Sequence, residues 1–119
     1  MHILLMFGSG AYRGLFNGVT VESNLSLAWM PIDASGPHVG NIQFWNASGG
    51  TGASGPGTWQ VTQSLATGLF TNPAAELWDL GEISVFWDSV FSRWIAFFNT
   101  GQVAGGGCAY YSSPWPWGP

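Results

Sequence analysis

Glycine and proline punctuate this chain at intervals that suit short strands. Its 119 residues include 18 glycines and 7 prolines, and neither residue type is favourable inside a helix. The segments between them are rich in Val, Ile, Thr, Phe and Trp, which favour strands. The spacing therefore predicts an all-β fold, mainly antiparallel, with its hairpins arranged as a sandwich or a barrel.

The first part of the chain carries clear strand signals. The apolar run at residues 3–7 predicts a first strand. Asn17-Gly18 suits the positive φ angles of a two-residue turn, so we expect a hairpin over about residues 12–23. In residues 24–30 large apolar side chains alternate with small ones, which predicts a strand with one buried face.

One segment, NPAAELWDLG, departs from the strand pattern. Asn72 suits a helix N-cap, Pro73 suits the first helical position, and Gly81 suits the left-handed residue that ends a helix. These positions predict one short helix near residues 73–80.

The most apolar part of the chain follows this segment. We expect two strands, at residues 83–87 and 93–98, joined through residues 88–92. The alternative is a helix that begins after Ser89 and ends at Gly101, because Val90, Phe91 and Trp94 belong to an apolar stripe with helical spacing.

A short internal repeat supports hairpins. Gln43-Phe44-Trp45-Asn46 resembles Val85-Phe86-Trp87-Asp88, and each tetrapeptide is followed by a gap and a second tryptophan, Trp59 or Trp94. Both units have the order strand, loop, strand. The glycine-dense residues 47–57 between the two strands of the first unit predict a long flexible connection.

Charge is unusually scarce. The chain has no lysine, and Arg13 and Arg93 are its only fixed cations against six acidic residues. Nucleic acids and anionic membranes are excluded as partners, because both require clustered Lys or Arg. A surface with so few charges is prone to association. We therefore expect other protein subunits, of the same or of a different chain, to cover part of it.

The sequence offers little for catalysis or for metal binding. Asp33, Ser35 and His38 lie close together, but in a Gly/Pro loop that favours a local turn over a catalytic triad. Three acids around the predicted helix suit a helix surface better than a glycosidase cleft. The single Cys108 has no partner for an internal disulfide, and we expect a small buried or idle thiol. We expect no catalytic residues, no metal and no cofactor.

The repeated tetrapeptides are also candidates for glycan binding. Tryptophan rings stack on sugar faces, and neighbouring polar side chains fix the hydroxyls. The candidate glycan-binding residues are Trp45, Asn46, Trp87 and Asp88.

The chain ends in YYSSPWPWGP, which has two tyrosines, two tryptophans, three prolines and no charge. We expect a β-rich domain at residues 1–104 and an extended, polyproline-like arm at residues 105–119. In such an arm Trp115 and Trp117 point in different directions and suit two separate pockets. The candidate partner-docking residues are Tyr110, Tyr111, Trp115 and Trp117. Packing onto the arm's own domain and stacking on a sugar are the alternatives.

Together these features predict a non-enzymatic structural subunit of a large assembly. The N-terminus lacks a basic region and a full apolar core, so we expect no signal peptide. No stretch approaches the length of a membrane span, and we expect no membrane insertion. The scarcity of lysine and the abundance of Gly, Ser, Thr, Asn and Trp suit an exposed extracellular surface. A virion protein of a bacterial virus, assembled in the cytoplasm and released by lysis, reconciles these expectations. The alternative is a small lectin-like carbohydrate-binding module.

Overall fold

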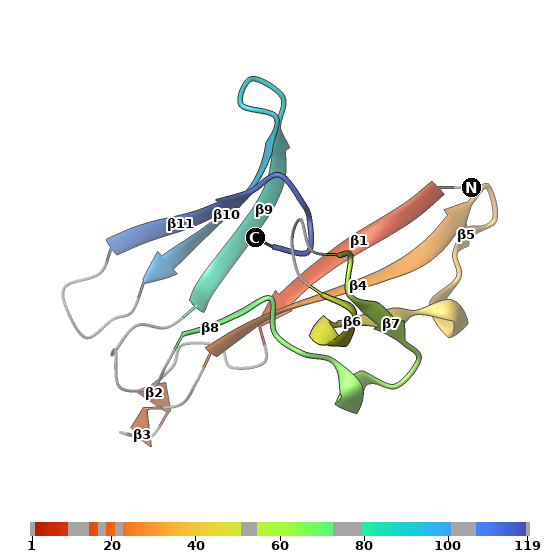
Figure 1. Cartoon of the computed structure of the whole chain (residues 1–119), viewed down its shortest axis with the longest axis horizontal. Helices are drawn as coiled ribbons and strands as arrows, with labels where there is room; N and C mark the ends of the chain where they lie inside the picture. The colour runs from red at the N-terminus through yellow and green to blue at the C-terminus, as the bar shows by residue number, and fades with distance from the viewer. Residues whose placement is uncertain are drawn as a thin grey trace.

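Two twisted sheets that diverge from a shared apolar core make up most of the structure (Figure 1). The structure is a computed structural model that describes residues 2–9, 15–16, 19–20, 23–50, 55–72, 80–100 and 107–118. All of its described strand pairs are antiparallel. The predicted all-β class is therefore confirmed.

The first sheet has six strands and is built around β4. It contains β1 (His2–Ser9), β4 (Ser23–Asp33), β5 (Gly36–Pro37), β6 (Gln43–Asn46), β7 (Thr58–Gln60) and β8 (Phe70–Asn72). One edge of β4 pairs with the whole length of β1, from His2↔Ile32 to Ser9↔Leu25. The other edge pairs in turn with β8, β6 and β5. Among the described residues, short 3₁₀ turns lie beside these strands at η1 (Val39–Asn41), η2 (Ala47–Gly49) and η4 (Gln63–Leu65).

The strand predicted at residues 24–30 is confirmed, but the prediction of a single buried face is wrong. Leu25 and Leu27 are buried as expected, and Ala28 and Met30 on the opposite face are buried as well. Next to the second face lie Phe44 of β6, which is the register partner of Ala28, and Ala66, which follows η4. An alternating sequence pattern does not predict that the second face of a strand is covered by residues from elsewhere in the chain.

The second sheet has three strands in the order β11, β10, β9. They are β9 (Leu80–Asp88), β10 (Arg93–Thr100) and β11 (Gly107–Ser113). The two strands expected at residues 83–87 and 93–98 are confirmed, and the helical alternative after Ser89 is wrong. The β-branched and aromatic residues of this segment decide the outcome, because their side chains fit a sheet better than a helix.

Two further predictions fall partly outside the described residues. The hairpin expected at residues 12–23 is present as β2 (Leu15–Phe16) and β3 (Val19–Thr20), which pair in a register that fits a two-residue turn. Asn17 and Gly18 themselves lie outside the described residues. Residues 73–79 of the predicted helix also lie outside them, and Leu80 and Gly81 belong to strand β9.

The internal repeat corresponds to two real hairpins. In the β6–β7 hairpin Trp45 is the register partner of Trp59, and in the β9–β10 hairpin Trp87 is the register partner of Trp94. The tryptophans are thus equivalent in position as well as in sequence. The two hairpins belong to different sheets, so the repeat describes local structure only.

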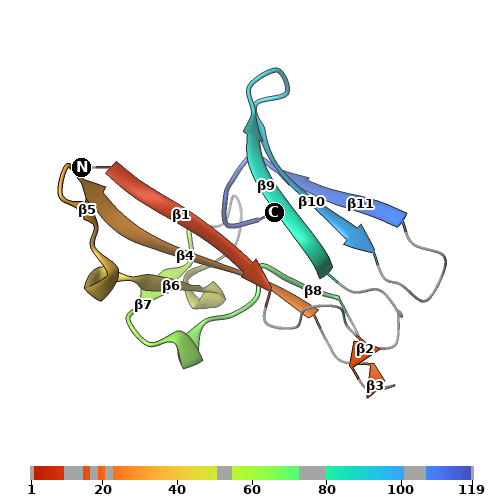
Figure 2. The same cartoon turned by 180° about the vertical axis from the view of Figure 1, so that it is seen from behind.

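The core lies where the two sheets meet. Leu25 of β4 and Phe98 of β10 are buried against each other, and Phe7, Leu69 and Ile83 pack around them. Seen from behind, the sheets diverge from this end, and the β9–β10 turn projects away from the molecule (Figure 2). We call the face of the β9–β11 sheet that carries Phe98 the inner face, and the opposite one the outer face.

Candidate functional site: an aromatic sheet face

The outer face presents a patch of large aromatic side chains. Phe86, Phe97 and Tyr110 come from three neighbouring strands, and their side chains are 45%, 44% and 67% exposed. Side chains alternate across a strand, which brings residues 95 and 97 of β10 to the same face as residues 110 and 112 of β11. Together with Ile95 and Phe91 these residues line a shallow groove of about 540 Å³.

Arg93 is the positively charged residue of this groove, and hydrogen bonds to the neighbouring strand β11 hold its guanidinium in place. Its Nε donates a hydrogen bond to Ser112 Oγ at 3.2 Å, and its Nη2 donates one to the Ser112 carbonyl at 3.4 Å. Arg93 and Asp88 are register partners in the β9–β10 hairpin. No Arg93–Asp88 ion pair forms within the described residues, because the guanidinium turns to Ser112.

The β9–β10 turn extends the aromatic surface beyond the sheet. The Asp88 carboxylate accepts hydrogen bonds from the backbone N–H groups of Val90 and Phe91, at 2.8 and 3.1 Å. Ser92 completes the turn with a φ of +51°. Because the turn is tied to Asp88, Val90 and Phe91 are held in exposed positions at its tip.

Cys108 lies on β11, two residues before Tyr110 and on the same face. Its thiol is free and exposed. Of the two alternatives, a buried or an idle thiol, the buried one is therefore wrong, because this position of the edge strand is exposed. The reactivity of this exposed thiol can therefore show whether another molecule covers the outer face.

The first pair of candidate glycan residues is engaged inside the domain. Trp45 is 1% exposed, and its Nε1–H donates to the Pro56 carbonyl at 2.8 Å. Asn46 accepts from the Ser48 N–H through Oδ1 at 2.8 Å and donates to the Leu65 carbonyl at 2.6 Å. A ring this deeply buried has no face to offer a sugar, so Trp45 is a core residue in this structure. The described parts of the glycine-dense connection pack on the domain around it.

In the second pair of candidate glycan-binding residues, Trp87 and Asp88, the tryptophan is much more exposed than Trp45. Trp87 is about half exposed and packs edge-on against Trp94, with 5.8 Å between ring centroids. Asp88 has the same role in this hairpin as Asn46 has in the first one. The side chain of each accepts a hydrogen bond from the backbone N–H two residues further along the chain. The polar residue of the repeat thus fixes a turn in both hairpins.

The four candidate docking residues are divided between the two faces of β11 and the turn after it. Tyr110 lies on the outer face, while Tyr111 stacks on Phe98 on the inner side with centroids 5.7 Å apart. Trp115 and Trp117 stack on each other at 5.7 Å and 10°. The prediction that these two indoles point in different directions is therefore wrong. The chain turns after Ser113, whose hydroxyl accepts the Trp115 N–H, instead of continuing as a straight polyproline helix.

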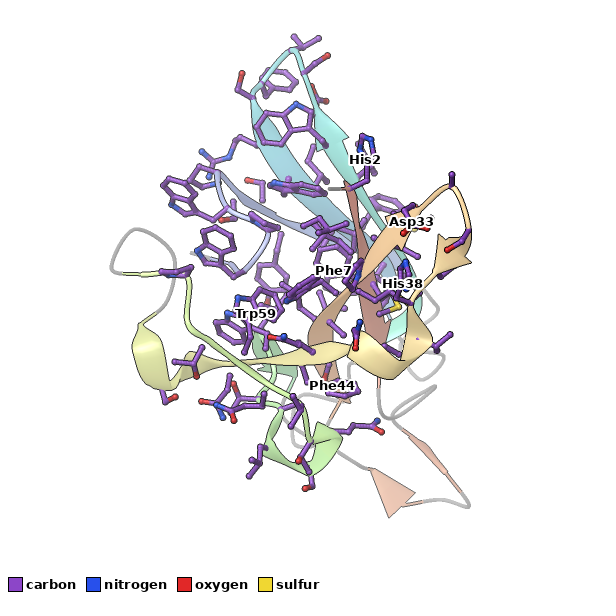
Figure 3. The ribbon with its side chains drawn as sticks, turned by 90° about the vertical axis from the view of Figure 1, so that its right-hand side faces the viewer. His2, Phe7, Asp33, His38, Phe44 and Trp59 are labelled. Atoms are coloured by element: carbon purple, nitrogen blue, oxygen red, sulfur yellow. The ribbon has the colours of Figure 1, made fainter. Side chains whose placement is uncertain are left out.

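Asp33, Ser35 and His38 form a compact polar cluster at the β4–β5 hairpin, and Figure 3 shows Asp33 and His38 close together there. Asp33 Oδ1 accepts hydrogen bonds from the Ser35 hydroxyl at 2.6 Å and from the Ser35 N–H at 2.8 Å. Asp33 Oδ2 lies 2.7 Å from His38 Nε2. These bonds, first from the Ser35 hydroxyl and then from His38, lower the pKa of Asp33 to about 2. The hydroxyl faces the carboxylate and not the imidazole, so no base is oriented on a nucleophile.

Metal ligands and membrane spans are also absent from the part of the chain that the structure describes. It contains no group of three or more His, Cys, Asp or Glu side chains that could hold a metal ion. None of its helical segments has the length and apolarity needed to cross a bilayer.

Sequence reasoning did not single out Phe86, Phe91 and Phe97 as a surface. The signal was present in residues 93–98, where apolar side chains occupy both sets of alternating positions. Such a strand needs cover on both faces, but in β10 the domain buries Phe98 on the inner face and leaves Phe97 on the outer face 44% exposed. Comparison of the chain with protein-family models, curated proteins and solved structures finds no match.

Proposed function

We propose that this protein is a non-enzymatic structural subunit of a larger assembly, and that its outer face packs against a neighbouring protein subunit. The observation that carries this proposal is the exposure of Phe86, Phe97 and Tyr110 side by side on one sheet face. Contiguous apolar patches on soluble domains mark interaction surfaces.

The composition of the outer face supports a protein partner. Aromatic residues and arginine are enriched in the centres of protein interfaces, and other charged residues are depleted there. The groove combines Phe and Tyr rings with one arginine whose charge is already hydrogen-bonded to Ser112. These two hydrogen bonds satisfy part of the guanidinium, and a partner that covers the groove has to supply an acidic group or further acceptors for the remaining positive charge.

The setting that we propose for such a subunit is the particle of a bacterial virus, as a minor capsid, decoration or tail component. Only 7% of the residues are charged, against about 25% in average soluble proteins. Scarce charge is tolerable on a surface that neighbouring subunits cover. Identification of the proteins that copurify with the chain from its native source tests this setting.

A substitution in the centre of the outer face tests the docking proposal. Phe97→Asp places a charge between the neighbouring strands, and we expect it to convert concentration-dependent oligomers into monomers in light scattering after size-exclusion chromatography. Val61→Asp is the matched control, because Val61 is 81% exposed and lies after β7, outside the groove. We expect this control to leave association unchanged.

Alkylation of Cys108 gives a second measurement that needs no substitution. If the outer face is docked, the thiol reacts more slowly in the assembled protein than in the dilute chain. Equal rates in the two states contradict the proposal. So does a monodisperse monomer that binds glycans saturably on an array, which supports the lectin-like alternative.

A further inference from the structure

A cavity of about 150 Å³ lies between the two sheets, on the side opposite the outer face. Phe7 and Leu25 line it from the first sheet, Trp94 and Ala96 line it from the second, and Trp115 lines it from the C-terminal turn. Figure 3 shows Phe7 among the side chains that fill the space between the sheets. Three separate parts of the chain thus contribute walls to one apolar space.

The walls are held in place by ring contacts. Phe7 and Trp94 face each other across the sheets with centroids 6.2 Å apart. Trp115 is backed by Trp117 in a stacked pair, and Tyr111 is backed by Phe98. Rings that are themselves packed lose little freedom when a ligand arrives, which favours binding.

The walls of the cavity are mostly apolar. Ser113 Oγ accepts the Trp115 N–H at 3.0 Å, and the Ser112 hydroxyl lies on the outer face, where it accepts the Arg93 Nε–H at 3.2 Å. Among the described residues that line the cavity there is no Asp, Glu, Lys or Arg. The site therefore gains nothing from a charged ligand, and a polar one would lose hydrogen bonds to water.

We propose that this cavity binds one neutral apolar molecule of about the size of a benzene ring. Apolar cavities of about 150 Å³ accept benzene-sized molecules, and aromatic walls suit a flat ring that stacks or meets their edges. The proposal goes beyond the assembly function, because the cavity and the outer face lie on opposite sides of the β9–β11 sheet.

The C-terminal turn forms one wall of the site. Its Gly118 N–H donates to the Trp115 carbonyl at 3.3 Å, and Gly118 itself lines the cavity. The aromatic tail then has a role within its own domain, as a wall that holds the ligand. Because Trp115 lies after the last strand, we expect removal of its ring to leave the sheets folded and to take away one wall of the site.

Titration with toluene, followed by methyl NMR of the full chain, tests the proposal. We expect saturable shifts at Leu25, Val85 and Ala96, and none at Val61 or Val90, which lie elsewhere on the surface. Shifts that never saturate, or that are spread equally over all of these methyl groups, overturn it.

Two variants and one alternative probe complete the test. Ala96→Leu fills the cavity and is expected to weaken toluene binding at least about tenfold, a loss of about 1.4 kcal/mol. Ala34→Leu, the same change in an exposed turn, is the matched control and is expected to bind normally. Should Ala96→Leu fail to fold, Trp115→Ala is expected to weaken binding without unfolding the sheets. Tighter binding of tetramethylammonium than of toluene overturns the proposal, because an aromatic cage for a cation predicts that order.

Discussion

Gly57 lies directly against the buried indole of Trp45. Its φ is +71°, and a Cβ at this position would collide with the indole nitrogen and stand 2.7 Å from the Asn46 carbonyl. We therefore expect Gly57→Ala to lower the free energy of unfolding by about 2–4 kcal/mol, through backbone strain and overpacking. Urea denaturation followed by tryptophan fluorescence measures the change.

Gly40 provides the control for this substitution. No atom lies within 4 Å of a Cβ built at Gly40, and its φ is not positive. We expect Gly40→Ala to change the free energy of unfolding by no more than about 1 kcal/mol in either direction. Equal effects at the two glycines would show that the contact with Trp45 is unimportant.

Asp33 is the residue whose titration the structure predicts most directly. Its pKa is lowered from an ordinary value of 3.8 to about 2, chiefly by the Ser35 hydroxyl and then by His38. We expect Ser35→Ala to move the carboxylate midpoint back toward 3.8 in an NMR pH titration. Ser64→Ala, at another exposed serine, is the control and leaves the midpoint unchanged.

The lowered pKa also fixes the direction of the pH effect on stability. The folded chain holds the Asp33 proton less tightly than the unfolded chain does, so the contribution is fully present above about 3.8. It is lost as the pH falls through the folded value of about 2. A folded-state midpoint at or above 3.8 in the unsubstituted protein would contradict the hydrogen-bonded turn.

At the scale of elements, the two tryptophan hairpins show what the sequence predicts and what it leaves open. The repeat correctly predicts both hairpins, because strand preference and turn chemistry are local properties. It does not predict that Trp45 is buried while Trp87 is half exposed. That difference depends on the Pro56 carbonyl and on Gly57, which close over Trp45. No matching segment covers Trp87 within the described chain.

The β9–β10 turn gives a prediction for one element. Asp88→Ala removes the acceptor of the Val90 and Phe91 N–H groups, and we expect it to lower the free energy of unfolding by about 1 kcal/mol. Asp88→Asn keeps an acceptor oxygen and is expected to restore most of this loss. Hydrogen exchange at the Val90 and Phe91 amides should accelerate in the alanine variant alone. Acceleration in both variants would show that the carboxylate charge holds the turn.

At the scale of the whole molecule, strand pairing was more predictable than the packing of the sheets. The alternation of residues 24–30 and the β-forming residues of 93–98 indicate strands, but neither feature says that Leu25 of one meets Phe98 of the other. The tail shows the same limit. Its prolines indicate a restricted segment, while the stacking of Trp115 on Trp117 follows from a turn that closes on Ser113. Contacts between distant segments carry no local sequence signal.

The meeting of Leu25 and Phe98 lies at the centre of the contact between the two diverging sheets (Figure 1). We expect Leu25→Ala and Phe98→Ala each to lower the free energy of unfolding by about 2–5 kcal/mol. Since the two side chains pack together, the double variant should lose less than the sum, by at least about 0.5 kcal/mol. Denaturation of the dilute chain measures this coupling.

Leu65→Ala and Phe91→Ala, at exposed positions, are the controls for this double variant. We expect each of them to change the free energy of unfolding little, and their effects to add. Strict additivity at positions 25 and 98 would mean that the sheets are held together elsewhere.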